Sequence, residues 1–324
     1  MSITYRLLIA LGAGTIAAVV FASATTGPVL MRMVLFMLTP LALFLAGVGL
    51  GPLAAVVAGV AGTLLVLAAG TATASMLFAA SQAIPVAILV YLAALHRETT
   101  EGTKEWYPPG RLVVAAAVLA GAFATFTLFL LGWDVEALRS VLRSMLQAFA
   151  ETELPNMPDA PALGPNEINE LADIALKLLP AASAVSSMCS LLFNLWLAGR
   201  ITLASGRLER PWPDLPAMTY PPITPLLLAL STGLGFFAGM AGMVAAAFAG
   251  ALFFAYVLLG LAVVHYVTRG RSWRLFALWA LYAALFVIST IALLPIALIG
   301  LAEAIWPMRK PMNPPRPPPG GPQT

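Results

Sequence analysis

The chain has 324 residues, of which 60% are hydrophobic and only 10% are charged, and its formal net charge is +3. Soluble domains carry about 25% charged residues, so this composition excludes an ordinary soluble protein. From Met33 to Leu95 there is no Asp, Glu, Lys, Arg or His. Because about 20 helical residues cross a hydrocarbon core of about 30 Å, this stretch alone suffices for roughly three crossings. The sequence predicts an all-α, polytopic transmembrane helix bundle.

The first predicted element follows Arg6 and covers the apolar run 7–21. Together with Ala22-Ser23-Ala24 it resembles a secretory signal with a cleavage site of the A-x-A kind. The alternative, which we favour, is an uncleaved first span, because further apolar segments follow it at once. Small residues recur at every fourth position, where they line one helix face and permit close helix packing in lipid. These residues are Ala10, Gly14, Ala18 and Ala22.

We expect about nine membrane spans, with eight as the alternative count. Gly and Pro separate the early spans, since both residue types interrupt helices. The expected spans cover about residues 7–25, 30–48, 52–69, 73–95, 111–131, 178–199, 223–239, 243–267 and 275–301. If only eight segments cross the membrane, the exception is the block at 275–301 or the stretch near 239–242.

Lys and Arg are distributed unevenly between the two sides. With a cytoplasmic N-terminus, ten of the seventeen lie in inner segments and four in outer loops, as the positive-inside rule requires. We therefore expect a multi-pass protein of the inner membrane with a cytoplasmic N-terminus. Nine spans would place a tail with Arg309, Lys310 and Arg316 outside. Either the tail is a tolerated exception, or one segment does not cross.

Polar segments divide the chain further. Residues 1–200 form a six-span bundle that includes an outer loop at 132–177, with eight acidic residues and two amphipathic stretches. These stretches suggest either an interfacial helical hairpin on lipid headgroups or a lid over an outward-facing pocket. Residues 201–306 comprise a Pro-rich cytoplasmic elbow and three further spans. Residues 307–324 are expected to be a disordered, Pro-rich tail.

The sequence lacks the motifs of several kinds of active site. It contains no H-E-x-x-H motif and no G-x-x-x-x-G-K-[ST] phosphate loop. The only histidines, His96 and His265, lie on helices distant in sequence, and Cys189 is the only cysteine. We therefore expect no catalytic residues, metal or cofactor. Because the basic residues are spread through short loops, we expect no nucleic-acid partner.

Away from their ends, the expected spans carry only neutral polar side chains, whereas ion-coupled transporters place titratable groups within the membrane. Two amides stand out: Gln82, three residues before Pro85, and Asn194, after a serine-rich stretch. Such groups hydrogen-bond a small neutral ligand or tie helices together. Gln82 and Asn194 are the candidate ligand-binding residues.

One pattern resembles a known family. It consists of Asn194-Leu-Trp196-Leu-Ala-Gly199-Arg200, Leu215-Pro216, Gly260-Leu-Ala-Val-Val-His265, Arg269-Gly270-Arg271 and Leu281-Tyr282. This pattern is similar to the YybS-like family of multispanning bacterial membrane proteins, over most of residues 1–306. That family looks distantly related to the substrate-binding subunits of energy-coupling-factor vitamin transporters, which are six-helix bundles.

The resemblance implies that residues 1–200 match the six-helix unit and that the small-residue face of the first span meets a transmembrane coupling protein with its ATPase. The chain departs from those subunits in its short first loop and its three extra spans. We expect a non-enzymatic protein of the lipid bilayer that binds or helps to move a small molecule with a separate energising partner. The alternative is a membrane scaffold or assembly factor of the cell envelope.

Overall fold

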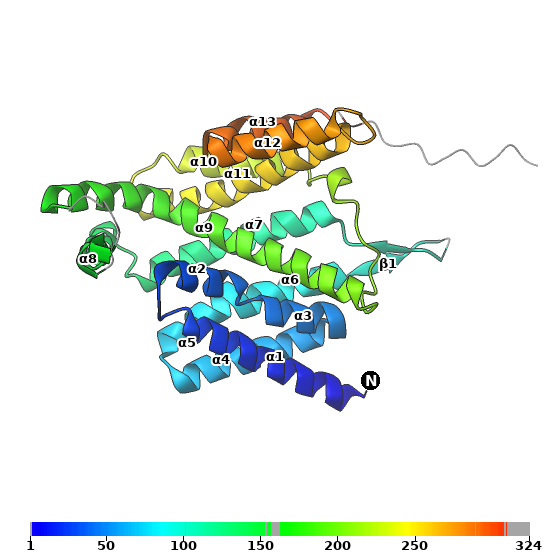
Figure 1. Ribbon diagram of the computed structural model, residues 1–324, viewed down its shortest axis with the longest axis horizontal. Helices are drawn as coiled ribbons and strands as arrows, with labels where there is room; N and C mark the ends of the chain where they lie inside the picture. The colour runs from blue at the N-terminus through cyan, green and yellow to red at the C-terminus, as the bar shows by residue number, and fades with distance from the viewer. Residues whose placement is uncertain are drawn as a thin grey trace, which may run out of the picture. The chain divides into compact units, whose positions relative to one another are not determined.

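The computed structural model describes residues 2–100, 102–152, 154–156, 163–288, 290–307 and 309. These residues are helical nearly throughout (Figure 1), which confirms the all-α prediction. Their strands form one small antiparallel hairpin, in which β1 (His96–Glu98) pairs with β2 (Lys104–Trp106). The predicted disordered tail at 307–324 lies outside the described residues, apart from residues 307 and 309.

The chain divides into two compact units, Met1–Pro213 with Thr219–Ala255, and Asp214–Met218 with Tyr256–Thr324. The first unit contains α1 (Ile3–Ser23), α2 (Val29–Leu38), α3 (Leu41–Leu50), α4 (Pro52–Ala69), α5 (Ala72–Phe78), the π-helix η1 (Ala79–Ala83), α6 (Ile84–Ala94), α7 (Pro109–Leu130), α8 (Val135–Thr152), the 3-10 turn η2 (Leu154–Asn156), α9 (Pro165–Ala204), α10 (Thr224–Leu234) and the first part of α11 (Met240–Val267). The second unit contains the 3-10 turn η3 (Leu215–Ala217), the rest of α11, α12 (Arg274–Val287) and α13 (Thr290–Ile305).

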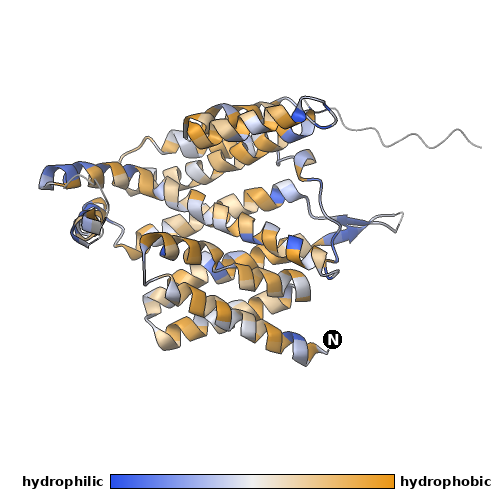
Figure 2. Cartoon of the chain, in the orientation of Figure 1, coloured by the Kyte–Doolittle hydropathy of each residue, from blue (hydrophilic) through white to orange (hydrophobic). Residues whose placement is uncertain are grey.

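Seven helical segments among the described residues are long and apolar enough to cross a membrane, so the chain is a multi-pass membrane protein. They are α1, α2 with α3, α4, α5 with α6, α7, α9 and α11. Six of them correspond to the first six predicted spans, and α11 corresponds to the span predicted at 243–267. Figure 2 shows apolar residues along these helices of the first unit, with hydrophilic residues gathered at β1–β2, on α8 and at the start of α9.

The last part of the chain differs from the nine-span prediction. The span predicted at 223–239 is α10, which has 11 residues, and the block at 275–301 is two helices, α12 and α13, of 14 and 16 residues. Each is shorter than the roughly 20 residues of a full crossing. α13 begins at Thr290, which follows Ser289 in an otherwise apolar run, so this short polar pair is the local sequence signal of the division.

Close packing of α13 on α11 accompanies that division. A Cβ at Gly300 would overlap the carbonyl oxygen of Tyr256 and lie 2.8 Å from the nitrogen of Gly260, and a Cβ at Gly260 would overlap the carbonyl oxygen of Ile296. Only glycine permits this approach of two backbones, which is how helices associate where lipid gives no hydrophobic drive.

Glycine packing also joins α1 to α4 in the first unit. A Cβ at Gly14 would overlap the carbonyl oxygen of Ala58 and lie 3.0 Å from the nitrogen of Gly62. α9, which is 40 residues and therefore about 60 Å long, packs along α7 and α3. The small residues predicted to pack helices are thus used within the chain.

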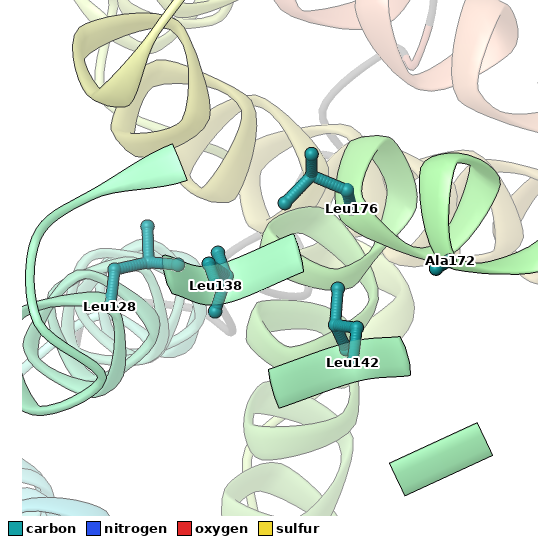
Figure 3. Packing of buried hydrophobic residues seen from close by; sticks show 5 residues of the cluster. All are labelled: Leu128, Leu138, Leu142, Ala172 and Leu176. Atoms are coloured by element: carbon teal, nitrogen blue, oxygen red, sulfur yellow. The ribbon is translucent and has the colours of Figure 1, made fainter. Parts of the chain in front are cut away.

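The outer amphipathic stretches form a helical pair, α8 against the first turns of α9. Leu138 and Leu142 of α8 are buried against Leu128 of α7 and against Ala172 and Leu176 of α9 (Figure 3). The apolar side of α8 therefore packs on protein rather than only on lipid headgroups.

An ion pair fixes the same two helices. Arg139 of α8 lies 2.8 Å from Asp173 of α9 and also 2.8 Å from Glu136 on its own helix. Met145 of α8 stays 64% exposed. That α8 and the first turns of α9 act as a lid stays a prediction.

Candidate functional site

The break at Pro40 leaves carbonyl groups without helical partners inside the first bundle. Proline has no N–H, and α2 ends at Leu38, so the preceding turn loses its regular donors. Thr39 satisfies two carbonyls: its hydroxyl donates to Leu35 at 2.9 Å and its backbone N–H donates to Phe36 at 3.3 Å. The carbonyl of Met37 is satisfied from another helix.

That other helix is α9. Ser190 Oγ donates to the Met37 oxygen at 2.8 Å, and Asn194 Nδ2 donates to it at 2.7 Å. Asn194 Nδ2 also donates to the Ser190 carbonyl at 2.7 Å. Neighbouring helices commonly satisfy the groups that a proline frees in a membrane span. Asn194 therefore ties α9 to the Pro40 break.

Asn194 nevertheless keeps an unused acceptor. The residue is completely buried, and its Oδ1 has no hydrogen-bond partner among the described residues. Since both recorded partners of the amide are carbonyls, the nitrogen must point toward Met37 and the oxygen away from it. Asn194 thus combines a tie between helices with a free carbonyl oxygen.

Replacing Asn194 with Ala should destabilise the bundle by about 0.6–2 kcal/mol, the range for interhelical hydrogen bonds in membranes. The Met37 carbonyl would then depend on Ser190 alone. Equilibrium unfolding in mixed micelles measures the loss. Ser183→Ala is the control, because the Ser183 hydroxyl donates to the Pro180 carbonyl of its own helix. Equal stability of the two variants would contradict the assignment.

Gln82 lies in η1, three residues before Pro85 of the fourth span. The N–H of Ile84 donates to Ala79, five residues back, which is the π-helical pattern that precedes Pro85. Gln82 is 2% exposed, and its Oε1 has no hydrogen-bond partner among the described residues. Short π-helical turns of this kind are frequent at functional sites.

Gln82 and Asn194 occupy different surroundings. η1 packs against α4, α5, α6 and α7, whereas Asn194 bonds to Met37 at the junction of α2 and α3. No hydrogen bond is recorded between the two amides in the described part of the chain. Each offers a neutral acceptor inside the bundle, which can bind a neutral donor but cannot carry a proton.

The small-residue face of α1 is largely covered. Ala10, Gly14 and Ala18 are buried, and Gly14 lies against α4, whereas Ala22 is exposed. Ala10, Gly14 and Ala18 therefore cannot also meet a separate coupling protein. The family resemblance implies that this face contacts a coupling protein. In the structure α4 already covers the face at Gly14.

Charged residues of the second unit form two ion pairs among the described residues. Glu303 and Arg309 form an ion pair of 2.9 Å, with side chains only 4% and 6% exposed. Arg309 also donates to the carbonyls of Pro216 and Met218. The sequence places Arg309 in the tail that is predicted to be disordered. Glu303 lies in the last turn of α13 and Arg309 lies beyond the helix end, six residues later, so no helical spacing reveals their pairing.

A second ion pair joins Asp214 to Arg269, whose Nη1 donates to Oδ2 at 2.9 Å and whose Nη2 donates to Oδ1 at 2.7 Å. Hydrogen bonding by Arg269 holds the pKa of Asp214 below its ordinary value, against the smaller opposing effect of desolvation. The same contact raises the pKa of Arg269.

Acid should therefore weaken the second unit through Asp214. A carboxyl group with a depressed folded pKa stabilises above its unfolded pKa, about 3.9, and this stabilisation is lost as the pH falls through the folded value. We expect thermal stability to fall below about pH 4, and to fall less steeply in Asp214→Asn. Glu209→Gln, at an exposed carboxylate, is the control. Equal pH dependence of Asp214→Asn and wild type would contradict the prediction.

Comparison with known proteins gives a match to one family model. No curated protein and no solved structure matches the chain. The family described as "Predicted membrane protein (DUF2232)" matches residues 15–303, a range that includes Gln82, Asn194 and Glu303. Seven apolar helices long enough to span a bilayer lie within the described residues, in agreement with that description. The chain therefore belongs to the DUF2232 family of predicted membrane proteins.

Proposed function

We propose that the protein lies in the bacterial inner membrane with its N-terminus in the cytoplasm, binds a small neutral solute within its first bundle, and helps to move it with energy from a separate partner. The observation that carries this proposal is Gln82, a buried amide in a π-helix whose Oε1 has no partner in the described part of the chain. The resemblance of residues 1–200 to transporter substrate-binding subunits supports the same proposal.

The free energy of an unused acceptor favours a ligand at this position. Leaving a buried acceptor without a partner costs about 1–3 kcal/mol, which a ligand N–H or O–H group recovers. The stretch around Gln82 contains no charged residue from Met33 to Leu95, so nothing there would neutralise an ionic ligand. A neutral hydrogen-bond donor is the class of solute that fits.

The energy must come from elsewhere. Proton- and ion-driven transporters use titratable groups inside the membrane, and the first four spans have none beyond Arg32 and Arg6 near their ends. The sequence also has no phosphate loop of the common ATPase type. A coupling partner would have to bind outside the covered part of the α1 face.

Gln82→Met tests the ligand site, because methionine has a similar size but no carbonyl oxygen. Without ligand, the variant should be more stable than wild type by about 1–3 kcal/mol, since an unpaired buried acceptor is removed. In a thermal-shift screen of the purified protein against neutral vitamins, nucleosides and sugars, it should lose any stabilisation that wild type gains.

Thr63→Val is the matched control, because the Thr63 hydroxyl is satisfied by Gly59 of its own helix. The control should keep the ligand-induced shift. A Gln82→Met variant that is less stable than wild type and retains the full shift would show that Gln82 only packs helices.

Reconstitution tests the need for a partner. Proteoliposomes that contain this chain alone should not accumulate a solute identified by the screen, and robust proton-driven uptake would overturn this part of the proposal. Crosslinking in the native membrane should recover an ATPase with a coupling protein. Recovery of envelope or division proteins instead would favour a membrane scaffold.

A further inference from the structure

The charged contacts of the second unit converge on one short segment, residues 214–218. Asp214 pairs with Arg269, which lies two residues beyond the end of α11. Pro216 and Met218 accept hydrogen bonds from Arg309, which lies beyond the end of α13. The chain after α11 and the chain after α13 therefore contact the same five residues.

Arg309 is held on several sides. Its Nε donates to Glu303 Oε1 at 2.9 Å, its Nη2 donates to the Met218 carbonyl at 2.8 Å, and its Cζ lies 5.6 Å from the ring centre of Tyr266. A buried guanidinium is tolerated when its donors are satisfied and an opposite charge is close. This arrangement meets both conditions, whereas a solvated tail would need neither.

The contacts determine the path of the last two helices. At Arg269 the chain contacts segment 214–218. It then runs through α12 and α13, and at Arg309 it contacts the same segment again. α12 and α13 contact each other and lie side by side in Figure 1. A chain that returns to its starting face has crossed the membrane an even number of times or not at all. The single crossing predicted at 275–301 would have ended on the opposite face.

We propose that Glu303, Arg309 and the carbonyls of Pro216 and Met218 form an ionic clamp that fastens the chain beyond α13 to segment 214–218. The clamp places Pro307 on the same membrane face as segment 214–218 of the elbow. The basic residues of the tail then follow the positive-inside rule, and no exception is needed. This inference is independent of any solute binding by the first unit.

Cysteine labelling from one side of the membrane tests the path. In a Cys189→Ser background, single cysteines are introduced by Pro307→Cys, Arg207→Cys in the elbow and Ser144→Cys on α8, all at exposed positions. A membrane-impermeant maleimide is applied to sealed vesicles of each orientation. Pro307→Cys should react from the same side as Arg207→Cys and from the side opposite to Ser144→Cys. Reaction together with Ser144→Cys would overturn the proposal.

The labelling rate of a buried position tests the clamp itself. Met218 is 8% exposed, so Met218→Cys should react slowly, and adding Arg309→Gln should raise its rate at least about tenfold because local opening becomes easier. Arg271→Gln, at an exposed arginine of the same unit, should leave the rate unchanged. Leu142→Cys in the first unit reports on general unfolding. No rise at Met218→Cys, or an equal rise at Leu142→Cys, would overturn the clamp.

Discussion

Removing Arg309 alone should destabilise the protein far more than removing Arg309 and Glu303 together. Arg309→Met leaves the Glu303 carboxylate buried without its guanidinium, and breaking a buried ion pair in this way costs about 3–5 kcal/mol. In the double variant Glu303→Met, Arg309→Met no buried charge is left, so most of that loss should be recovered. Residual destabilisation is expected, because the carbonyls of Pro216 and Met218 lose their donor.

A double-mutant cycle of unfolding free energies, measured in mixed micelles, gives the coupling between the two residues. Arg271→Met is the control for loss of an arginine at an exposed position and should change stability by no more than about 0.5 kcal/mol. Additive effects of Glu303→Met and Arg309→Met would show that the two side chains do not act as a pair.

Gly14→Ala should destabilise the first unit, whereas Gly12→Ala on the same helix should not. A Cβ at Gly14 meets the backbone of Ala58 and Gly62, which cannot move aside as a flexible side chain can. Overpacking of this kind costs about 1–3 kcal/mol. At Gly12 nothing lies within 4 Å, so alanine there should be neutral or stabilising by about 0.5–1 kcal/mol through its better helix propensity.

The Gly14 and Gly12 pair also bears on coupling partners. If α1 were a free surface for another protein, both substitutions would affect partner binding more than the stability of the isolated chain. Equal unfolding free energies of the purified Gly14→Ala and Gly12→Ala variants would mean that α1 and α4 do not pack as described. A clear difference would support a partner surface elsewhere.

The two candidate amides show how far sequence reasoning reaches. Gln82 and Asn194 could be singled out because they are rare polar groups in apolar spans. Their partners could not be assigned: Asn194 bonds to Met37, 157 positions away in the chain, and no local pattern encodes that distance. The spare carbonyl oxygens are visible only once every neighbour has been placed.

The sequence by itself determined the membrane environment and the all-helical class of the fold. A charge-free run from Met33 to Leu95 must lie in lipid, and in lipid the backbone must satisfy its own hydrogen bonds, so that run must be helical. These conclusions depend only on local composition and length.

Only the tertiary structure decided which glycines are covered and which charges pair. The contact of Gly14 with Ala58 and the meeting of Arg309 with Glu303 and segment 214–218 both depend on packing. In a chain this apolar, lipid-facing surfaces and helix contacts are built from the same residue types. The sequence therefore does not distinguish them, and only the packing does.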